Sequence, residues 1–138
     1  MDIKKDVEHL IGSHNTNNPF IIANNLNIIL IYSDMKNTLG FFNKYKRSKF
    51  IHLNNKIPDN LKNFVCAHEL GHAIRHADMN TPFLKSHTLF STDKIEREAN
   101  TFAVELLMPD SLVKKSECSI YLLAMALGIP GKLADLKK

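Results

Sequence analysis

Two histidines four residues apart constrain the fold of this chain more than any other feature of its sequence. His68 and His72 stand in the pattern His-Glu-x-x-His, and side chains four residues apart on an α-helix lie on one face, about 6 Å apart. Both imidazole rings can therefore bind one metal ion. Glu69 borders the same face, where its carboxylate can contact a metal-bound water without binding the metal. The pattern predicts a helix that carries a metal site and a free carboxylate.

The apolar residues around the histidines indicate that this helix, predicted over residues 60–77, is buried. Buried imidazoles need a polar partner or a metal ion. The alternative interpretation is an ordinary surface helix, because a five-residue pattern also occurs by chance. The apolar residues on the histidines' side are Leu61, Phe64 and Val65, and those on the opposite face are Cys66, Ala67, Leu70, Ala73, Ile74 and Ala77.

A third metal ligand must come from elsewhere in the chain. His76 continues the four-residue spacing, but on a straight helix it lies about 12 Å along the axis from His68, too far for two ligands of one ion. No glycine between His72 and His76 breaks the helix to bring the outer rings closer. We therefore expect His76 to support a ligand from behind or to pack at the helix end.

A second long helix, predicted over residues 92–108, offers two carboxylates. At roughly 100° per residue, Glu96 lies nearer than Glu98 to the centre of the helix's apolar stripe. A carboxylate beside an apolar stripe is costly unless it is paired or binds a metal. We expect Glu96 to be the third ligand, Glu98 to be a solvated surface acid, and Asn100 to hold a ligand by a hydrogen bond. The stripe consists of Ile95, Ala99, Phe102, Ala103, Leu106 and Leu107.

The rest of the chain predicts an α+β fold. Its 138 residues are enough for one domain, and no linker or repeat divides them, so we expect a single domain over residues 1–138. A small three-stranded antiparallel sheet is expected to pack on a helical core that contains the His-Glu-x-x-His helix. The strands are expected over residues 27–32, 37–45 and 49–53, and the other helices over residues 2–12 (ending at Gly12), 19–26, 119–127 and 130–137.

Targeting signals are absent from the sequence. No run of about 18 apolar residues is present to span a membrane, and the N-terminus lacks the apolar core of a signal peptide. We therefore expect a cytoplasmic location and no membrane partner. Cys66 and Cys118 are too few for a disulfide framework, which also favours a reducing compartment.

The two long helices together resemble the ImmA/IrrE family of zinc metallopeptidases. The more specific motif is Glu-x-x-Ala-Asn-x-Phe-Ala in residues 96–103, followed by Leu-Leu-Met-Pro in residues 106–109. The resemblance covers essentially the whole chain. It implies one Zn²⁺ per chain, with Glu69 as general base and three ligands, His68, His72 and Glu96. It also implies a minimal stand-alone member of phage or mobile-element type that cleaves a separate helix-turn-helix transcriptional repressor.

Other functions stay open on the sequence alone. The main alternative is a non-enzymatic zinc-containing regulatory module that binds a partner protein or DNA, because residues 122–129 faintly resemble the first half of a helix-turn-helix. Only nine residues follow Ile129, which leaves little for a recognition helix, and a structural zinc site does not need Glu69. A toxin or another hydrolase is a third possibility. Candidates for stabilising an oxyanion are Tyr45, His52 and His87.

Positive charge is concentrated in the predicted sheet. The chain has 18 Lys and Arg against 14 Asp and Glu, yet no acid lies between Asp34 and Asp59. We expect the edge strand within residues 37–53 to bind an extended peptide. The alternative is that the cations only keep an exposed edge soluble. Direct nucleic-acid binding is not expected, since no aromatic or glycine pattern accompanies the charge. The cations expected to steer an acidic segment of the substrate are Lys44, Lys46, Arg47 and Lys49.

Overall fold

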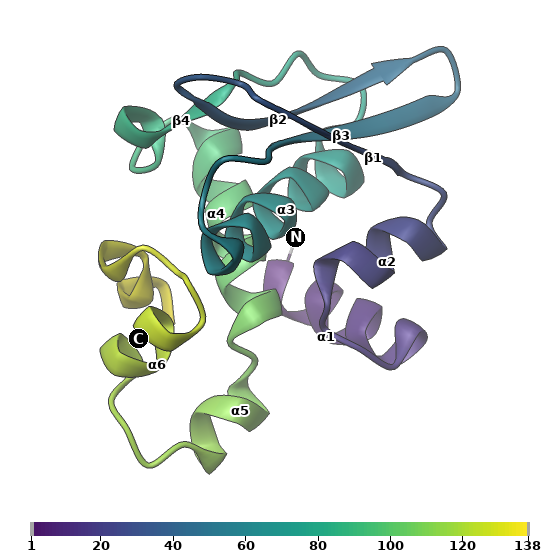
Figure 1. Ribbon diagram of the computed structural model, residues 1–138. Coiled ribbons are helices and arrows are strands. Elements are labelled where there is room, and N and C mark those ends of the chain that lie inside the picture. The colour runs from purple at the N-terminus through teal and green to yellow at the C-terminus, as the bar shows by residue number, and fades with distance from the viewer. Residues whose placement is uncertain (1, 138) are drawn as a thin grey trace.

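The computed structural model describes residues 2–137 and shows a small sheet lying across a group of helices (Figure 1). α3 and α4 are the two long helices predicted around His68 and Glu96. In chain order the elements are α1 (Ile3–His14), α2 (Pro19–Asn25), β1 (Ile29–Ser33), β2 (Thr38–Tyr45), β3 (Ser48–Asn54), α3 (Asp59–Arg75), β4 (Leu84–Lys85), the 3-10 helix η1 (Ser86–Thr88), α4 (Lys94–Leu107), α5 (Asp110–Lys115), α6 (Ile120–Ala126) and the 3-10 helix η2 (Gly131–Lys137).

The sheet is mixed and has four strands in the order β1-β3-β2-β4, so the prediction of three antiparallel strands was wrong in two respects. β2 and β3 form the expected antiparallel hairpin, but β3 lies between β1 and β2 and runs parallel to β1, with Ile29 opposite Phe50. Each strand was predicted from its local pattern, and local patterns do not say which strands become neighbours. β4 adds a fourth strand antiparallel to β2, and two residues are too few to show a strand periodicity.

α3 lies between the sheet and α4, which explains why its histidines are buried (Figure 1). All residues of α3 from Phe64 to Ala73 are buried. Ile51 and Leu53 of β3 are also fully buried, because alternate side chains of a strand point to the same face. Each apolar side chain buried in this way contributes about 1.5–3 kcal/mol to folding. The helix predicted to carry the metal site is therefore the centre of the core.

Two glycines set the spacing of these layers. A Cβ added at Gly71, within the His-Glu-x-x-His pattern, would lie 3.1 Å from atoms of Phe102, so glycine allows α4 to approach α3 closely. A Cβ added at Gly40 of β2 would lie 2.6 Å from Cγ1 of Val65 on the other side of α3. Because these contacts leave no room for a methyl group, the sheet, α3 and α4 pack close to one another around the histidines.

Several helix ends differ from the prediction. α1 continues past Gly12 and ends at His14. The capping residue Asn15 has the left-handed backbone conformation (φ 55°) that asparagine tolerates at a helix end. Pro109 follows α4 as expected, but α5 begins at the next residue. The segment after Ile129 forms η2, a 3-10 helix rather than a recognition helix. None of the helices within residues 2–137 is long and apolar enough to cross a membrane.

Candidate metal centre

Three side chains from the two long helices meet in the core. His68 Nε2 lies 3.1 Å from Glu96 Oε1, and His72 Nε2 lies 2.9 Å from Glu96 Oε2. The nitrogen and oxygen atoms that His68, His72 and Glu96 offer all lie within 4.8 Å of one another. α3 supplies the histidines one turn apart, and α4 supplies the carboxylate from its first turn. The structure thus brings together the three residues that the sequence analysis expected to share a metal ion.

The orientation of His68 is set by Asn100. Asn100 Nδ2 donates to the carbonyl of Leu89 at 2.7 Å, which identifies the amide nitrogen because a carbonyl oxygen can only accept. The amide oxygen of Asn100 therefore faces His68 Nδ1, at 2.8 Å, and accepts a hydrogen bond from it. A neutral His68 ring then has its lone pair on Nε2, which points at Glu96.

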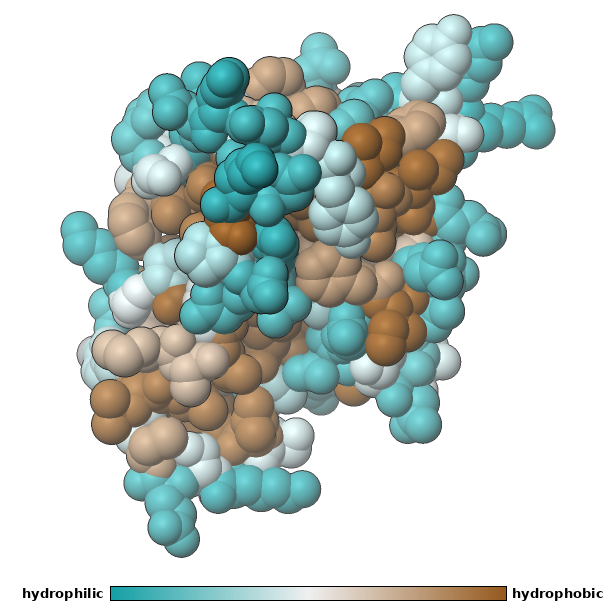
Figure 2. Space-filling view, viewed as in Figure 1, coloured by the Kyte–Doolittle hydropathy of each residue, from teal (hydrophilic) through white to brown (hydrophobic). Residues whose placement is uncertain are grey.

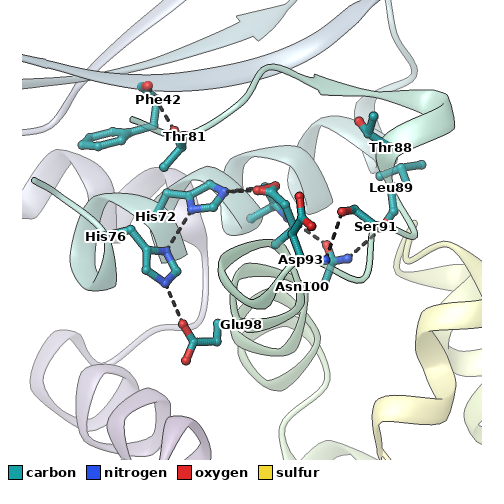
Figure 3. Close-up of polar contacts among 12 residues, drawn as sticks. Phe42, His72, His76, Thr81, Thr88, Leu89, Ser91, Asp93, Glu98 and Asn100 are labelled. Atoms are coloured by element: carbon teal, nitrogen blue, oxygen red, sulfur yellow. Dashed lines mark hydrogen bonds and ion pairs between the residues drawn. The ribbon is translucent and has the colours of Figure 1, made fainter. Parts of the chain in front are cut away.

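His72 is held by a second hydrogen-bonded chain, which leads to Glu98 (Figure 3). His72 Nδ1 lies 2.9 Å from His76 Nδ1, and His76 Nε2 lies 2.8 Å from Glu98 Oε1. Glu98 is on the outer flank of α4, as expected, but it is not merely a solvated acid, because its side chain is 26% exposed and paired with His76. The prediction considered α4 by itself, whereas the partner of Glu98 comes from the end of α3.

The donor atoms fit a divalent cation. Two imidazole nitrogens and one carboxylate are the ligand set of catalytic zinc sites that keep a fourth position open. The lone pairs of neutral His68 and His72 rings would repel the Glu96 carboxylate unless a proton or a cation lay between them. Burial raises the pKa of Glu96, but hydrogen bonds from His68 and His72, which require a proton in that place, outweigh burial and hold the pKa at about 2. The carboxylate is therefore charged and available as a ligand.

Glu69 is a buried acid next to the candidate metal ligand His68. Its side chain has no exposed surface, and neither carboxylate oxygen has a hydrogen-bond partner within residues 2–137. Burial raises the pKa of Glu69 to about 8, His72 opposes the shift, and Glu96 adds to it. Buried polar groups are normally hydrogen-bonded, and an unpaired one destabilises the fold by about 1–3 kcal/mol. Such a group points to a functional role rather than a structural one.

Comparison with known proteins places the chain in a family. A peptidase family model described as the IrrE N-terminal-like domain matches residues 23–128, which include the sheet, α3 and α4. The chain belongs to this peptidase family. The resemblance to ImmA/IrrE metallopeptidases that the two motifs predicted is therefore confirmed.

Two relatives extend the comparison beyond the matched domain. "Uncharacterized immunity region protein 2" of Bacillus phage phi105 is 46% identical over 139 residues, which cover 98% of this chain and 88% of the relative. "Metallopeptidase ImmA" of Bacillus subtilis (strain 168) is 31% identical over 116 residues, which cover 83% of this chain and 68% of the relative. The relationship to both proteins extends well outside the two motifs.

The four cations of the hairpin differ in their surroundings. Lys44 forms an ion pair with Asp78 at 2.9 Å, and Lys49 donates to the carbonyl of Ala73 near the C-terminal end of α3 at 2.9 Å. The cations at the turn are Lys46, whose ammonium lies 5.4 Å from the ring centre of Tyr45, and Arg47 beside it. Lys44 and Lys49 therefore have structural partners, which sequence separation concealed.

A hollow of about 420 Å³ lies along the outer edge of β2 in this peptidase fold. One wall contains Phe41 and Lys44 of β2, and the other contains Asp78, Thr81 and Phe83 from the segment after α3. β4 pairs with β2 only at its start, so the edge beyond Gly40 faces this hollow. The sequence analysis expected an edge strand here but not the segment opposite it.

The three residues suggested for oxyanion stabilisation are dispersed. Tyr45 is 64% exposed at the tip of the hairpin. His52 stacks on Phe41 on the face of the sheet opposite to that of Ile51 and Leu53, so it points away from α3. His87 is exposed on η1, in the segment that joins α3 to α4. The structure brings neither Tyr45 nor His52 to the metal centre.

Proposed function

We propose that this protein is a zinc-dependent endopeptidase that hydrolyses a peptide bond in a regulatory protein. The observation that carries the proposal is Glu69, a fully buried carboxylate with no hydrogen-bond partner among the described residues, beside a convergent His68, His72 and Glu96 set. A structural zinc site needs only its ligands, so the free carboxylate favours hydrolysis over the non-enzymatic alternative.

Each residue has a distinct part in this reaction. His68, His72 and Glu96 would hold the ion, which when bound supplies Lewis-acid polarisation of the scissile carbonyl and of a water. Glu69 accepts a proton from the attacking water as the oxygen bonds to the carbonyl carbon. Glu69 then returns the proton to the leaving nitrogen as the carbon–nitrogen bond breaks. Glu69, whose pKa burial raises to about 8, would be kept ionised near neutral pH by the positive charge of a bound ion.

The substrate we propose is a helix-turn-helix repressor of a phage or mobile element. The relative from phage phi105 is named as an immunity region protein, and the relative from B. subtilis is named as a metallopeptidase. Together the names favour a peptidase that acts on a regulatory protein of an immunity region. The repressor would be a separate chain, and the reaction would take place in the cytoplasm.

The outer edge of β2 is the proposed binding site for the peptide. From Phe41 to Tyr45 this edge has no strand partner within residues 2–137, so its backbone can pair with an extended peptide. Lys46 and Arg47 at the adjacent turn would attract an acidic segment of the substrate. Lys44 and Lys49 contribute positive charge from fixed positions.

The closed metal centre implies that a segment moves when the substrate binds. His68, Glu69 and His72 have no exposed surface. Residues 76–93 join α3 to α4, and β4 within them pairs with β2 at only two positions. We expect this segment to shift, so hydrogen exchange at residues 84–85 should increase when an inactive Glu69→Gln variant binds its substrate. Unchanged hydrogen exchange at residues 84–85 would contradict the movement of this segment.

The proposed function is tested with the purified protein and a repressor encoded beside its gene. We expect about one zinc per chain by elemental analysis, and cleavage of the repressor at one bond by mass spectrometry. A chelator should stop cleavage and added zinc should restore it. Stable binding of the repressor without cleavage, in zinc-loaded protein, would favour the non-enzymatic module instead.

A further inference from the structure

The proposed function leaves one buried polar chain without a role. His76 closes the C-terminal end of α3 and is only 4% exposed. Its two ring nitrogens contact His72 on one side and Glu98 on the other, at 2.9 and 2.8 Å. Glu98 is not among the three residues that converge on the metal centre. The chain nevertheless links it to a metal ligand through two hydrogen bonds.

The acceptor at the end of this chain determines the direction of both hydrogen bonds. The Glu98 carboxylate can only accept, so His76 Nε2 carries the proton that it donates. In a neutral His76 ring the lone pair is then on Nδ1, which accepts a hydrogen bond from His72 Nδ1. His72 is left with its lone pair on Nε2, which points at Glu96 and the proposed metal position. One acid thus selects the tautomer of two successive rings.

We propose that Glu98 is a positioning residue of the metal centre, which acts through His76 to hold His72 in its metal-binding tautomer and orientation. This inference rests on the proposed function only in that it assumes a divalent ion on His72. It assigns to Glu98 an effect on metal affinity, where the position of Glu98 on α4 alone predicted none. A carboxylate that acts on a ligand through an intervening histidine extends the usual direct contact by one ring.

Glu98 is itself held in place from a third element. Arg75 Nη2 lies 3.8 Å from Glu98 Oε2, and Arg75 Nη1 donates to Asp6 of α1 at 3.0 Å. The Arg75 side chain is 9% exposed, so it is fixed by packing between α1 and α4. α1 therefore helps to orient the Glu98 carboxylate, which two hydrogen bonds link to His72 through His76.

Zinc binding by matched variants tests the proposal. We expect Glu98→Ala and His76→Phe to weaken zinc binding about 10–100-fold, the usual effect of losing such support, in competition titrations with a chromophoric chelator. Glu98→Gln keeps an oxygen that accepts from His76 and should stay within about threefold of the parent protein. Glu8→Ala removes an exposed helical acid from α1 and should leave zinc affinity unchanged.

Two further readouts separate positioning from a general structural role. The double variant Glu98→Ala/His76→Phe should lose no more affinity than His76→Phe alone, because both residues act through one chain. Nitrogen-15 NMR of the zinc-loaded parent protein should show a proton on His72 Nδ1 that is protected from exchange with water, and this proton should exchange faster in Glu98→Ala.

The outcomes distinguish this inference from the proposed function. If the parent protein binds no zinc, the proposed function fails. If the parent binds zinc and Glu98→Ala binds it equally tightly, only the positioning role of Glu98 is overturned. Additive losses in the double variant would also overturn it, since they would show that the two side chains act independently.

Discussion

The two histidines of the metal centre are one turn apart on the same helix, yet they are held in different ways. His68 donates to a buried amide, Asn100, which is anchored in turn by the backbone carbonyl of Leu89. His72 is held through His76 by Glu98, whose side chain is 26% exposed. One support ends on the backbone inside the core, and the other ends on a side chain at the surface.

The difference between the supports predicts how each one fails. Removing a buried amide takes away the partner that the Leu89 carbonyl and His68 Nδ1 share, and leaves two polar groups of the core unpaired. Removing Glu98 opens a partly exposed position where water can replace one hydrogen bond. Support from within the core should therefore be the stronger of the two, and the following variants test this comparison from the largest expected effect to the smallest.

Loss of the Glu96 carboxylate, which both histidines contact, should abolish metal binding. Glu96→Ala removes the side chain that both histidines contact, so we expect no retained zinc and no proteolysis. Elemental analysis and the repressor cleavage assay measure these losses. Retention of stoichiometric zinc by Glu96→Ala would show that the two histidines bind the ion with some other ligand.

Loss of the proton acceptor should leave both supports intact. Glu69→Gln keeps the shape of the side chain but cannot accept a proton, so we expect zinc content to persist and the cleavage rate to fall about 10²–10⁴-fold. The fold should not be destabilised, because Glu69 has no hydrogen-bond partner to lose in the part of the chain that the structure describes. Loss of zinc from this variant would contradict the separation of base and ligands.

Removal of the buried amide should be more harmful than removal of Glu98. Asn100→Ala is expected to lower the free energy of unfolding by about 1–3 kcal/mol, because it leaves buried polar groups unpaired, and to weaken zinc binding about 10–100-fold. Denaturant titrations of the metal-free protein measure the stability change. Equal stability losses in Asn100→Ala and Glu98→Ala would remove the distinction between the two supports.

Separation of the two long helices should disturb both supports equally. Gly71→Ala places a methyl group 3.1 Å from Phe102, so α4 must shift away from α3. We expect a loss of about 1–3 kcal/mol in the free energy of unfolding and weaker zinc binding. The matched control is Gly131→Ala, where an added Cβ has no neighbour within 4 Å. An equally stable Gly71→Ala protein would show that α4 adjusts without cost.

Charge at the hairpin turn should matter least, because it lies outside both supports. The double variant Lys46→Glu/Arg47→Glu should slow cleavage of the repressor several-fold at low salt and hardly at 1 M salt, where the Debye length is about 3 Å. Zinc content should not change. Lys114→Glu/Lys115→Glu on α5 changes the net charge equally and serves as the control. Cleavage rates that change neither with salt concentration nor with the two turn substitutions would favour the alternative that the cations only keep an exposed edge soluble.

Features that depend on residues close together in the sequence were predicted better than features that depend on distant residues. Residues 60–77 and 92–108 were predicted as helices. α4 lies within its predicted range, and α3 begins one residue before its own and ends two residues before the predicted end. Within each helix, the 3.6-residue period placed His68 with His72 and Glu96 nearer to the apolar stripe than Glu98. The sheet was predicted less well, because the parallel pairing of β1 with β3 depends on residues about 20 positions apart.

The sequence by itself determined which side chains share a helix face and which family the chain belongs to, because both depend on residues close together or on matched motifs. Only the tertiary structure decided that His76 meets Glu98, that Asn100 is anchored by Leu89, and that Lys49 contacts the end of α3. Each of these contacts joins segments that are brought together by packing around α3. No periodicity within one segment encodes the side chain that another segment will place beside it.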